Sequence, residues 1–333
     1  FYPGELSLKM LPFMGGRSCA FLFGFILVAS WVHASAVFSL ERSFAWKDVE
    51  RIVAVGDIHG DYEQLARCLR DAQIVDERNQ WIGGKTHLVQ TGDIFGRGTE
   101  SRKALDLLMA LEPQAEKAGG RVHVLLGNHE AMVLAGYYGY LRPEDIEGFG
   151  GGKELQAAMK PDGVYGRWLR GRNAVIQIND ILFVHGGLSP DYAGLPLKEI
   201  NERVVRALGG EGGAADDPSG PLWYRGLAVE DEEAVREVLE IVRRTHGARH
   251  IVIGHTVAPA QEIRARTGGG VILIDVGMSR GYLRGPAAFL RIENGRFITV
   301  MDGKERELEI APANPAEAPA TFPSPNASTP AAE

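Results

Sequence analysis

Five short polar motifs in this sequence each follow an apolar run. They are Gly56-Asp57-Ile58-His59-Gly60, Gly92-Asp93, Gly127-Asn128-His129-Glu130, His185-Gly186-Gly187 and Gly254-His255-Thr256. Aspartate and asparagine offer oxygen donors and histidine offers a nitrogen donor, while glycine lets the backbone bend tightly around a small centre. Two aspartates, one asparagine and three histidines are enough to hold two divalent ions if one carboxylate bridges them. Mixed nitrogen and oxygen donors without thiolate favour manganese, iron or zinc over calcium or copper(I).

The elements that must position these motifs alternate between strands and helices in the first half of the chain. Residues 51–55, 87–90 and 121–126 are predicted strands, and residues 61–72 and 101–117 have apolar side chains at helical spacing. This β-α-β-α-β order predicts parallel strands joined by crossover helices. Binding sites in such architectures form at the carboxyl ends of the strands, where the motifs stand.

The second half of the chain contains too many hairpin-linked strands for one parallel sheet. Residues 174–178 and 181–184 flank Asn179-Asp180, and further strands are predicted at 250–253, 271–276, 287–292 and 296–301. The predicted fold class is therefore α/β, a two-sheet β-sandwich flanked by helices. Residues 139–173 are polar and glycine-rich, which indicates a small helical cap insertion, and residues 211–220 are predicted to form a flexible loop.

Both ends of the chain are predicted to lie outside the folded domain of residues 44–310. Lys9 and Arg17 precede the apolar residues 19–32, and Ala34-Ser35-Ala36 follows them, as in a cleaved secretory signal peptide spanning residues 1–36. We therefore expect an exported protein, periplasmic or secreted, without stable membrane insertion after cleavage; an uncleaved segment would be a membrane anchor. Residues 311–333 are rich in proline and alanine, which predicts a disordered tail.

The net charge restricts the possible partners. At pH 7 the formal charge is -7, which supplies no broad basic face for nucleic acid. Recognition of a phosphate group by a few arginines remains compatible with this balance, whereas nucleic acid is not an expected partner.

The motifs GDIHG, GD…RG, GNHE, HGG and GH, in this order, resemble those of the calcineurin-like metallophosphoesterases, specifically the phosphoprotein phosphatase branch. The resemblance covers residues 51–284 and implies an α/β sandwich with a dinuclear metal centre. It implies six metal ligands: Asp57 and His59 on the first ion, Asp93 bridging both, and Asn128, His185 and His255 on the second.

The same resemblance implies the catalytic groups of a phosphomonoester hydrolase. His129 would donate a proton to the leaving group, and Arg97 would bind phosphate oxygens together with Asn128. Two close cations lower the pKa of a shared water, so that hydroxide attacks phosphorus in line. Arg225, in the stretch Trp223-Tyr224-Arg225-Gly226, is a candidate second phosphate ligand, although a surface arginine beside a packed tryptophan is the alternative.

One position departs from the family pattern. The usual loop reads GD-x-x-DRG, and its second aspartate orients the GNHE histidine, but this chain has Gly96 there. We expect His129 to have a lowered pKa and a looser orientation unless another acid, Glu100 or Asp275, substitutes. The segments WYRG and 274–279 resemble the Shewanella-like phosphatases, a branch that can favour phosphotyrosine, and this substrate is a hypothesis here.

Two other functions are compatible with the sequence. An enzyme of the same fold could cleave a small phosphate ester or a dinucleoside polyphosphate. The departure at Gly96 also allows a non-catalytic module that binds phosphoproteins. The six intact ligand positions favour an enzyme, since a binding module has no need of a complete metal centre.

Overall fold

The computed structural model describes residues 43–310. The predicted signal peptide of residues 1–36 and the predicted tail of residues 311–333 therefore lie outside the described residues. In the described part of the chain, no helix is long and apolar enough to span a bilayer.

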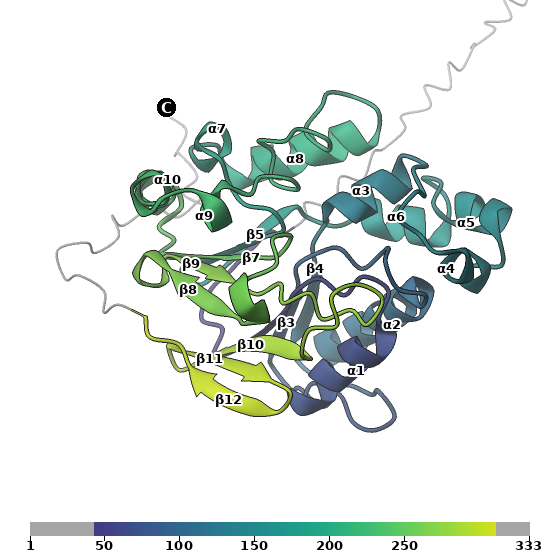
Figure 1. Cartoon of the computed structure of the whole chain (residues 1–333), viewed down its shortest axis with the longest axis horizontal. Helices are drawn as coiled ribbons and strands as arrows, with labels where there is room; N and C mark the ends of the chain where they lie inside the picture. The colour runs from purple at the N-terminus through teal and green to yellow at the C-terminus, as the bar shows by residue number, and fades with distance from the viewer. Residues whose placement is uncertain (1–42, 311–333) are drawn as a thin grey trace, which may run out of the picture. The chain divides into compact units, whose positions relative to one another are not determined.

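Two six-stranded sheets form the centre of the fold, as the sequence predicts (Figure 1). The first has the order β12-β11-β10-β2-β3-β4. Its strands are β2 (Arg51–Val55), β3 (His87–Gln90), β4 (Arg121–Val124), β10 (Ala288–Glu293), β11 (Arg296–Met301) and β12 (Lys304–Glu307). Strands β2, β3 and β4 are parallel, with Val55 paired to Gln90 and Gln90 to Val124, so their carboxyl ends are level.

The second sheet has the order β1-β5-β6-β7-β9-β8. Its strands are β1 (Ala45–Trp46), β5 (Val175–Ile178), β6 (Ile181–Val184), β7 (His250–Ile253), β8 (Arg264–Arg266) and β9 (Val271–Leu273). The predicted hairpin joins β5 to β6, whereas β6 pairs with β7 in parallel, Val184 opposite Ile253. The motifs that begin at His185 and Gly254 therefore start side by side. The predicted strands 121–126 and 271–276 are shorter in the structure, since β4 ends at Val124 and β9 ends at Leu273.

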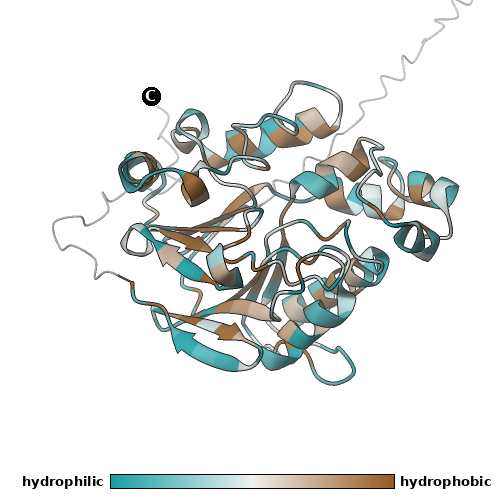
Figure 2. Ribbon diagram, viewed as in Figure 1, coloured by the Kyte–Doolittle hydropathy of each residue, from teal (hydrophilic) through white to brown (hydrophobic). Residues whose placement is uncertain are grey.

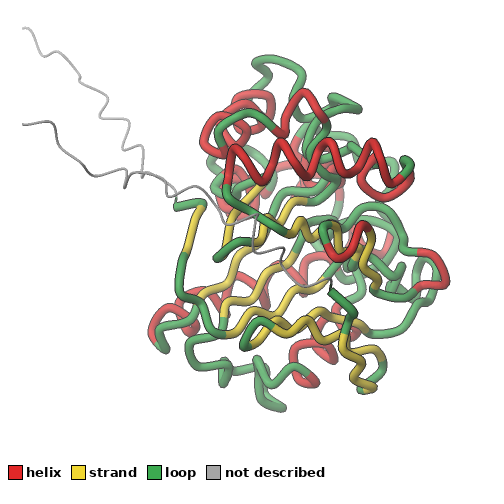
Figure 3. The backbone as a smooth tube through the Cα atoms, turned by 90° about the vertical axis from the view of Figure 1, so that its left-hand side faces the viewer, coloured by secondary structure: helices red, strands yellow, loops and turns green. Residues whose placement is uncertain are grey.

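Side-chain alternation builds the layers on either side of the second sheet. In β6, Phe183 packs into the core shared with the first sheet, whereas Leu182 and Val184 pack against helices on the outer face. Those outer helices are α7 (Pro190–Ala193), α8 (Leu197–Leu208), α9 (Gly226–Val229) and α10 (Glu232–His246). Helices α1 (Tyr62–Asp71) and α2 (Ser101–Lys117) lie beside the first sheet, and Figure 3 shows the strands between the two sets of helices.

The remaining helices follow β4. They are α3 (Asn128–Leu134), α4 (Pro143–Gly148), α5 (Gly152–Ala158) and α6 (Val164–Arg170), the last three within the predicted cap insertion. The cap is bonded to the body through Asp145, whose carboxylate accepts hydrogen bonds from Ser101 N at 2.8 Å and Ser101 Oγ at 2.7 Å. Asp145 thereby satisfies a backbone donor at the start of α2, where the N-cap residue Glu100 makes no side-chain cap.

Hydropathy follows these layers. Figure 2 shows apolar strands inside the sandwich and a polar edge strand β12, whose sequence is KERE and whose four residues are exposed. Charged side chains on an edge strand disfavour pairing with another chain.

Candidate metal centre

The five motifs meet where strands of both sheets end. Asp57 and His59 follow β2, Asp93 follows β3, and Asn128 begins α3. From the second sheet, His185 follows β6 and His255 follows β7 at a short distance. Two groups could each hold a metal ion, His59 with Asp93 and His129, and Asp93 with His185 and His255. In each group the candidate ligand atoms all lie within 4.8 Å of one another.

Asp93 belongs to both groups. Its Oδ1 lies 3.3 Å from His185 Nε2, whereas its Oδ2 lies 3.8 Å from His59 Nε2 and 3.8 Å from His129 Nε2. The two oxygens of one carboxylate therefore face different sets of nitrogen donors. This is the arrangement that a bridging carboxylate requires.

Backbone carbonyls orient three imidazoles. Nδ1 of His59 lies 3.0 Å from Phe95 O, and Nδ1 of His185 lies 2.9 Å from Thr91 O. Because a carbonyl oxygen only accepts, each Nδ1 donates to it, which leaves Nε2 facing the centre. Nε2 of His185 lies 3.0 Å from Oδ1 of Asn128, another predicted ligand. For His255 the assignment is reversed, since its Nε2 lies 3.2 Å from Trp223 O and leaves Nδ1 free.

The acids around the centre are crowded and buried. Burial raises the pKa of Asp57, and the charges of Asp275 and Asp93 raise it further. Burial opposes ionisation of Asp93 too, but the neighbouring histidines His185 and His129 outweigh it and hold the pKa of Asp93 well below its usual range. Buried carboxylates next to imidazoles have a donor chemistry that suits divalent cations.

Glu130 holds the loops that carry the ligands, a role that the sequence analysis missed. Its buried carboxylate accepts hydrogen bonds from Asp93 N at 2.7 Å, Ile94 N at 2.8 Å and Gly127 N at 2.8 Å. It thus connects the loop after β3 to the loop after β4. The only sequence signal was a glutamate at the third position of a helix that starts at the motif.

The residues predicted to bind phosphate surround one cavity of about 300 Å³, together with Asn128 and His129. Arg97 lies in it with its guanidinium between two tyrosine rings. Arg225 also lines it, and Nη1 of Arg225 donates to His255 O at 2.8 Å and to Thr256 Oγ1 at 3.0 Å. Both arginines therefore border the cavity beside the candidate ligand residues, and Arg225 is also exposed to solvent.

Gly96 lies directly against the imidazole of His129. A Cβ built on Gly96 would meet His129 Nδ1 at 2.6 Å, and Gly96 has a φ of 85°. Among residues 43–310, no hydrogen bond to this imidazole is formed, and the nearest ion-pair partner is Asp93 at 3.8 Å. Burial lowers the pKa of His129 to about 4, against the opposing effect of Asp93.

Neither acid considered as a substitute takes the missing position. Glu100 bonds Lys103 Nζ at 2.6 Å, and Asp275 accepts a hydrogen bond from Gly277 N at 2.8 Å. Asp275 does line the cavity, but it makes no hydrogen bond to His129.

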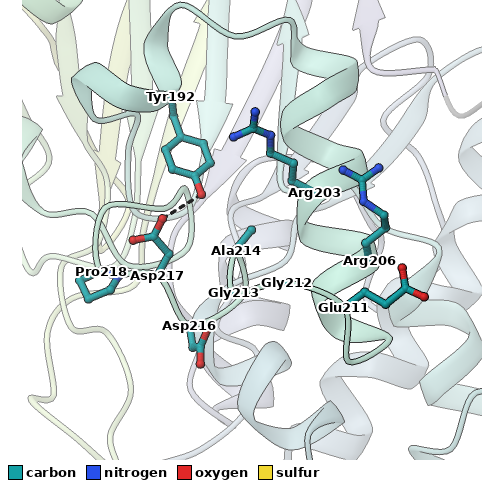
Figure 4. Close-up of a pocket in the computed structure, with 10 residues that line it drawn as sticks. All are labelled: Tyr192, Arg203, Arg206, Glu211, Gly212, Gly213, Ala214, Asp216, Asp217 and Pro218. Atoms are coloured by element: carbon teal, nitrogen blue, oxygen red, sulfur yellow. Dashed lines mark hydrogen bonds between the residues drawn. The ribbon is translucent and has the colours of Figure 1, made fainter.

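A larger cavity of about 550 Å³ lies beside α8 and the loop of residues 211–218 (Figure 4). Arg203, Arg206 and three acids line it, and Tyr192 Oη donates to Asp217 at 2.9 Å on one side. None of the predicted metal or phosphate ligands lines this cavity.

The fold and the paired metal groups define a class of protein. Residues 50–259 match the family model of the calcineurin-like phosphoesterases, and the chain belongs to that family. It is a metal-dependent phosphatase that uses two divalent ions, with candidate ligand groups at the ends of both sheets.

More particular relatives come from one branch of that family. Shewanella-like protein phosphatase 1 of Plasmodium berghei is 30% identical over 279 residues, which cover 79% of this chain and 76% of that protein. Shewanella-like protein phosphatase 2 of Arabidopsis thaliana is also 30% identical, over 76% of this chain and 77% of that protein. Among solved structures, the cold-active protein-tyrosine phosphatase of a psychrophilic Shewanella species is 31% identical with a TM-score of 0.70, covering 80% of this chain and 82% of that one.

Proposed function

We propose that this enzyme is a protein phosphatase that hydrolyses phosphotyrosine in preference to phosphoserine and phosphothreonine. The observation that carries the proposal is the imidazole of His129, which lies against Gly96 and makes no hydrogen bond to a carboxylate. A proton donor that no acid orients is less effective. Phenol has a pKa of about 10, so phenoxide leaves with less protonation than an alkoxide does. Relatives named protein phosphatase and protein-tyrosine phosphatase support this substrate class.

The roles of the site residues form part of the proposal. We assign the two ions to six ligands, which are Asp57, His59, Asp93, Asn128, His185 and His255. Asp57 belongs to neither of the two groups found in the structure, and its assignment rests on the motif and on its carboxylate, which lies 3.9 Å from His185 Nδ1 and accepts a hydrogen bond from His255 N. Bound cations would supply an activated water and neutralise charge on the phosphoryl oxygens. Arg97 and Arg225 bind those oxygens through planar, permanently charged guanidinium groups, and His129 faces the leaving group. The donor set of imidazole and carboxylate supports manganese, iron or zinc.

Matched peptides test the substrate. With manganese present, we expect kcat/KM for a phosphotyrosine peptide to exceed that for the same peptide with phosphoserine by at least about tenfold. A chelator should abolish both activities, and added metal should restore them. Equal or faster turnover of phosphoserine would overturn the preference, and preferred cleavage of diadenosine tetraphosphate would favour the small-molecule alternative. Metal-independent binding of phosphopeptides without turnover would favour the non-catalytic module.

We also propose that the enzyme acts outside the cytoplasm. The basic residues Lys9 and Arg17, the apolar residues 19–32 and the Ala34-Ser35-Ala36 sequence support export and cleavage after Ala36. We expect the mature chain recovered from the periplasm or medium to begin at Val37 by N-terminal sequencing. A mature protein that retains residues 19–32 would contradict cleavage and support a membrane anchor.

A further inference from the structure

The guanidinium of Arg97 lies between two aromatic rings. Its Cζ is 4.7 Å from the centroid of the Tyr140 ring and 4.8 Å from that of Tyr282. Tyr140 belongs to the segment between α3 and α4, and Tyr282 belongs to the loop between β9 and β10. Both tyrosines line the cavity of the metal centre and each is 41% exposed, so both rings that contact the Arg97 guanidinium border this cavity.

The backbone ties these three segments together. Arg97 N donates to Tyr140 O at 3.0 Å. The side chain of Arg142 adds two hydrogen bonds, because its Nε donates to Arg97 O at 2.5 Å and its Nη2 donates to Gly281 O at 3.1 Å. One arginine of the cap therefore links the loop that carries Arg97 to the loop that carries Tyr282.

The loop of Tyr282 has further anchors on the motif loop after β2. The guanidinium of Arg280 donates to the buried carboxylate of Asp61, with Nη2 at 2.6 Å from Oδ1 and Nε at 2.9 Å from Oδ2. Ser279 Oγ donates to His59 O at 3.0 Å. Tyr282 is thus held in place relative to the first metal group by contacts that do not involve Arg97.

The side chain of Arg97 has no polar partner that would orient it. In the part of the chain that the structure describes, it forms no ion pair, and its Nε is buried without a hydrogen-bond partner. The backbone of Arg97 is itself in the left-handed region, with a φ of 67°. An arginine has several flexible torsions, and fixing them costs side-chain entropy. The two rings are the contacts that limit this freedom.

We propose that Tyr140 and Tyr282 are positioning residues that hold the Arg97 guanidinium ready for a phosphate group, with Arg142 fixing the separation of their loops. The rings interact with the Arg97 cation through their aromatic faces and accept no hydrogen bond from it, so its N–H donors stay available for phosphate oxygens. A carboxylate partner would compete for those same donors. This inference rests on the proposed role of Arg97 in binding phosphate.

Competitive inhibition by inorganic phosphate tests the inference, because phosphate has no aryl group that could stack on the rings directly. We expect Tyr140→Leu and Tyr282→Leu each to raise the Ki of phosphate about threefold to tenfold in the manganese-loaded enzyme, with a smaller change in kcat. Tyr140→Phe and Tyr282→Phe keep the ring and should stay within about twofold of wild type. Tyr137→Leu is the matched control, since Tyr137 is exposed and packs on Tyr140, at 5.9 Å between ring centroids, without contacting Arg97.

A double-mutant cycle with Arg97→Ala separates the possible failures. If Arg97→Ala raises Ki and the leucine changes have no further effect in that background, the positioning role is supported. If Arg97→Ala leaves Ki unchanged, the proposed role of Arg97 fails. Thermal unfolding should first show that the leucine variants are folded. If Arg97→Ala raises Ki but the folded leucine variants leave Ki unchanged, the inference is overturned. A loss confined to the KM of aryl phosphates would show that the rings contact substrate instead, which also overturns it.

Discussion

Replacing Asp93 by asparagine is expected to lower kcat for para-nitrophenyl phosphate by about a thousandfold, since paired cations contribute several kcal/mol to the transition state. The reason lies in the two carboxylate oxygens, which face His185 on one side and His59 and His129 on the other. An asparagine keeps the shape but replaces one anionic oxygen with an NH₂ group that cannot bind a cation. We expect the metal content to fall from two manganese ions per chain to one or none, measured by elemental analysis after gel filtration.

Asp191→Asn is a suitable control for this substitution. Asp191 is an exposed aspartate at the start of α7 and lines neither cavity. Its replacement should leave kcat and metal content unchanged, and thermal unfolding should show that both variants are folded. An Asp93→Asn enzyme that retains two ions and most of its activity would contradict the bridging role.

Replacing His129 by glutamine is expected to lower kcat for a phosphoserine peptide by about a hundredfold, the smaller end of the range for general acid catalysis. The loss for an aryl phosphate should be smaller, because phenoxide needs less protonation as it leaves. The measurement is kcat for a series of phosphate esters with leaving groups of increasing pKa, in wild type and variant. The variant should depend more steeply on leaving-group pKa, and parallel slopes would show that His129 does not protonate the leaving group.

Gly96→Asp tests the role of His129 by adding the carboxylate that this chain lacks. The imidazole occupies the space beside Gly96, so an aspartate requires His129 to withdraw before its carboxylate can bond Nδ1. Gly96→Ala is the matched variant, because it shares the positive φ and the crowding but has no carboxylate. Phosphoserine turnover should be higher in the aspartate variant than in the alanine variant. Equal turnover would mean that the missing carboxylate does not limit this enzyme.

The convergence of the motifs could be predicted from the sequence because the register of the paired strands largely determines where the motifs lie. Parallel strands of similar length end at the same edge, so Asp57, Asp93 and Asn128 are neighbours once Val55, Gln90 and Val124 are paired. The second sheet repeats this for His185 and His255 through the pairing of β6 with β7. The periodicity of apolar residues and the positions of the motifs were sufficient to predict this part of the centre.

The contacts around Arg97 could not be predicted in this way. Tyr140, Arg142 and Tyr282 belong to irregular segments, where no periodic pattern indicates which way a side chain points. Their meeting depends on how the cap and the loop after β9 pack on the body, a long-range property of the fold. The closeness of Gly96 to His129 is of the same kind, since the sequence shows a missing carboxylate but not that the imidazole lies against the vacated position.

The two sheets contribute separate ligands to one centre, and this has a thermodynamic consequence. His59 and Asp93 come from the first sheet, whereas His185 and His255 come from the second. Ions bound by both would crosslink the two halves of the sandwich without a covalent bond. Binding to the folded chain alone adds about 1.4 kcal/mol of stability per site for each tenfold rise in free metal above its Kd. Metal supply would then control how long the folded enzyme persists as well as how fast it turns over.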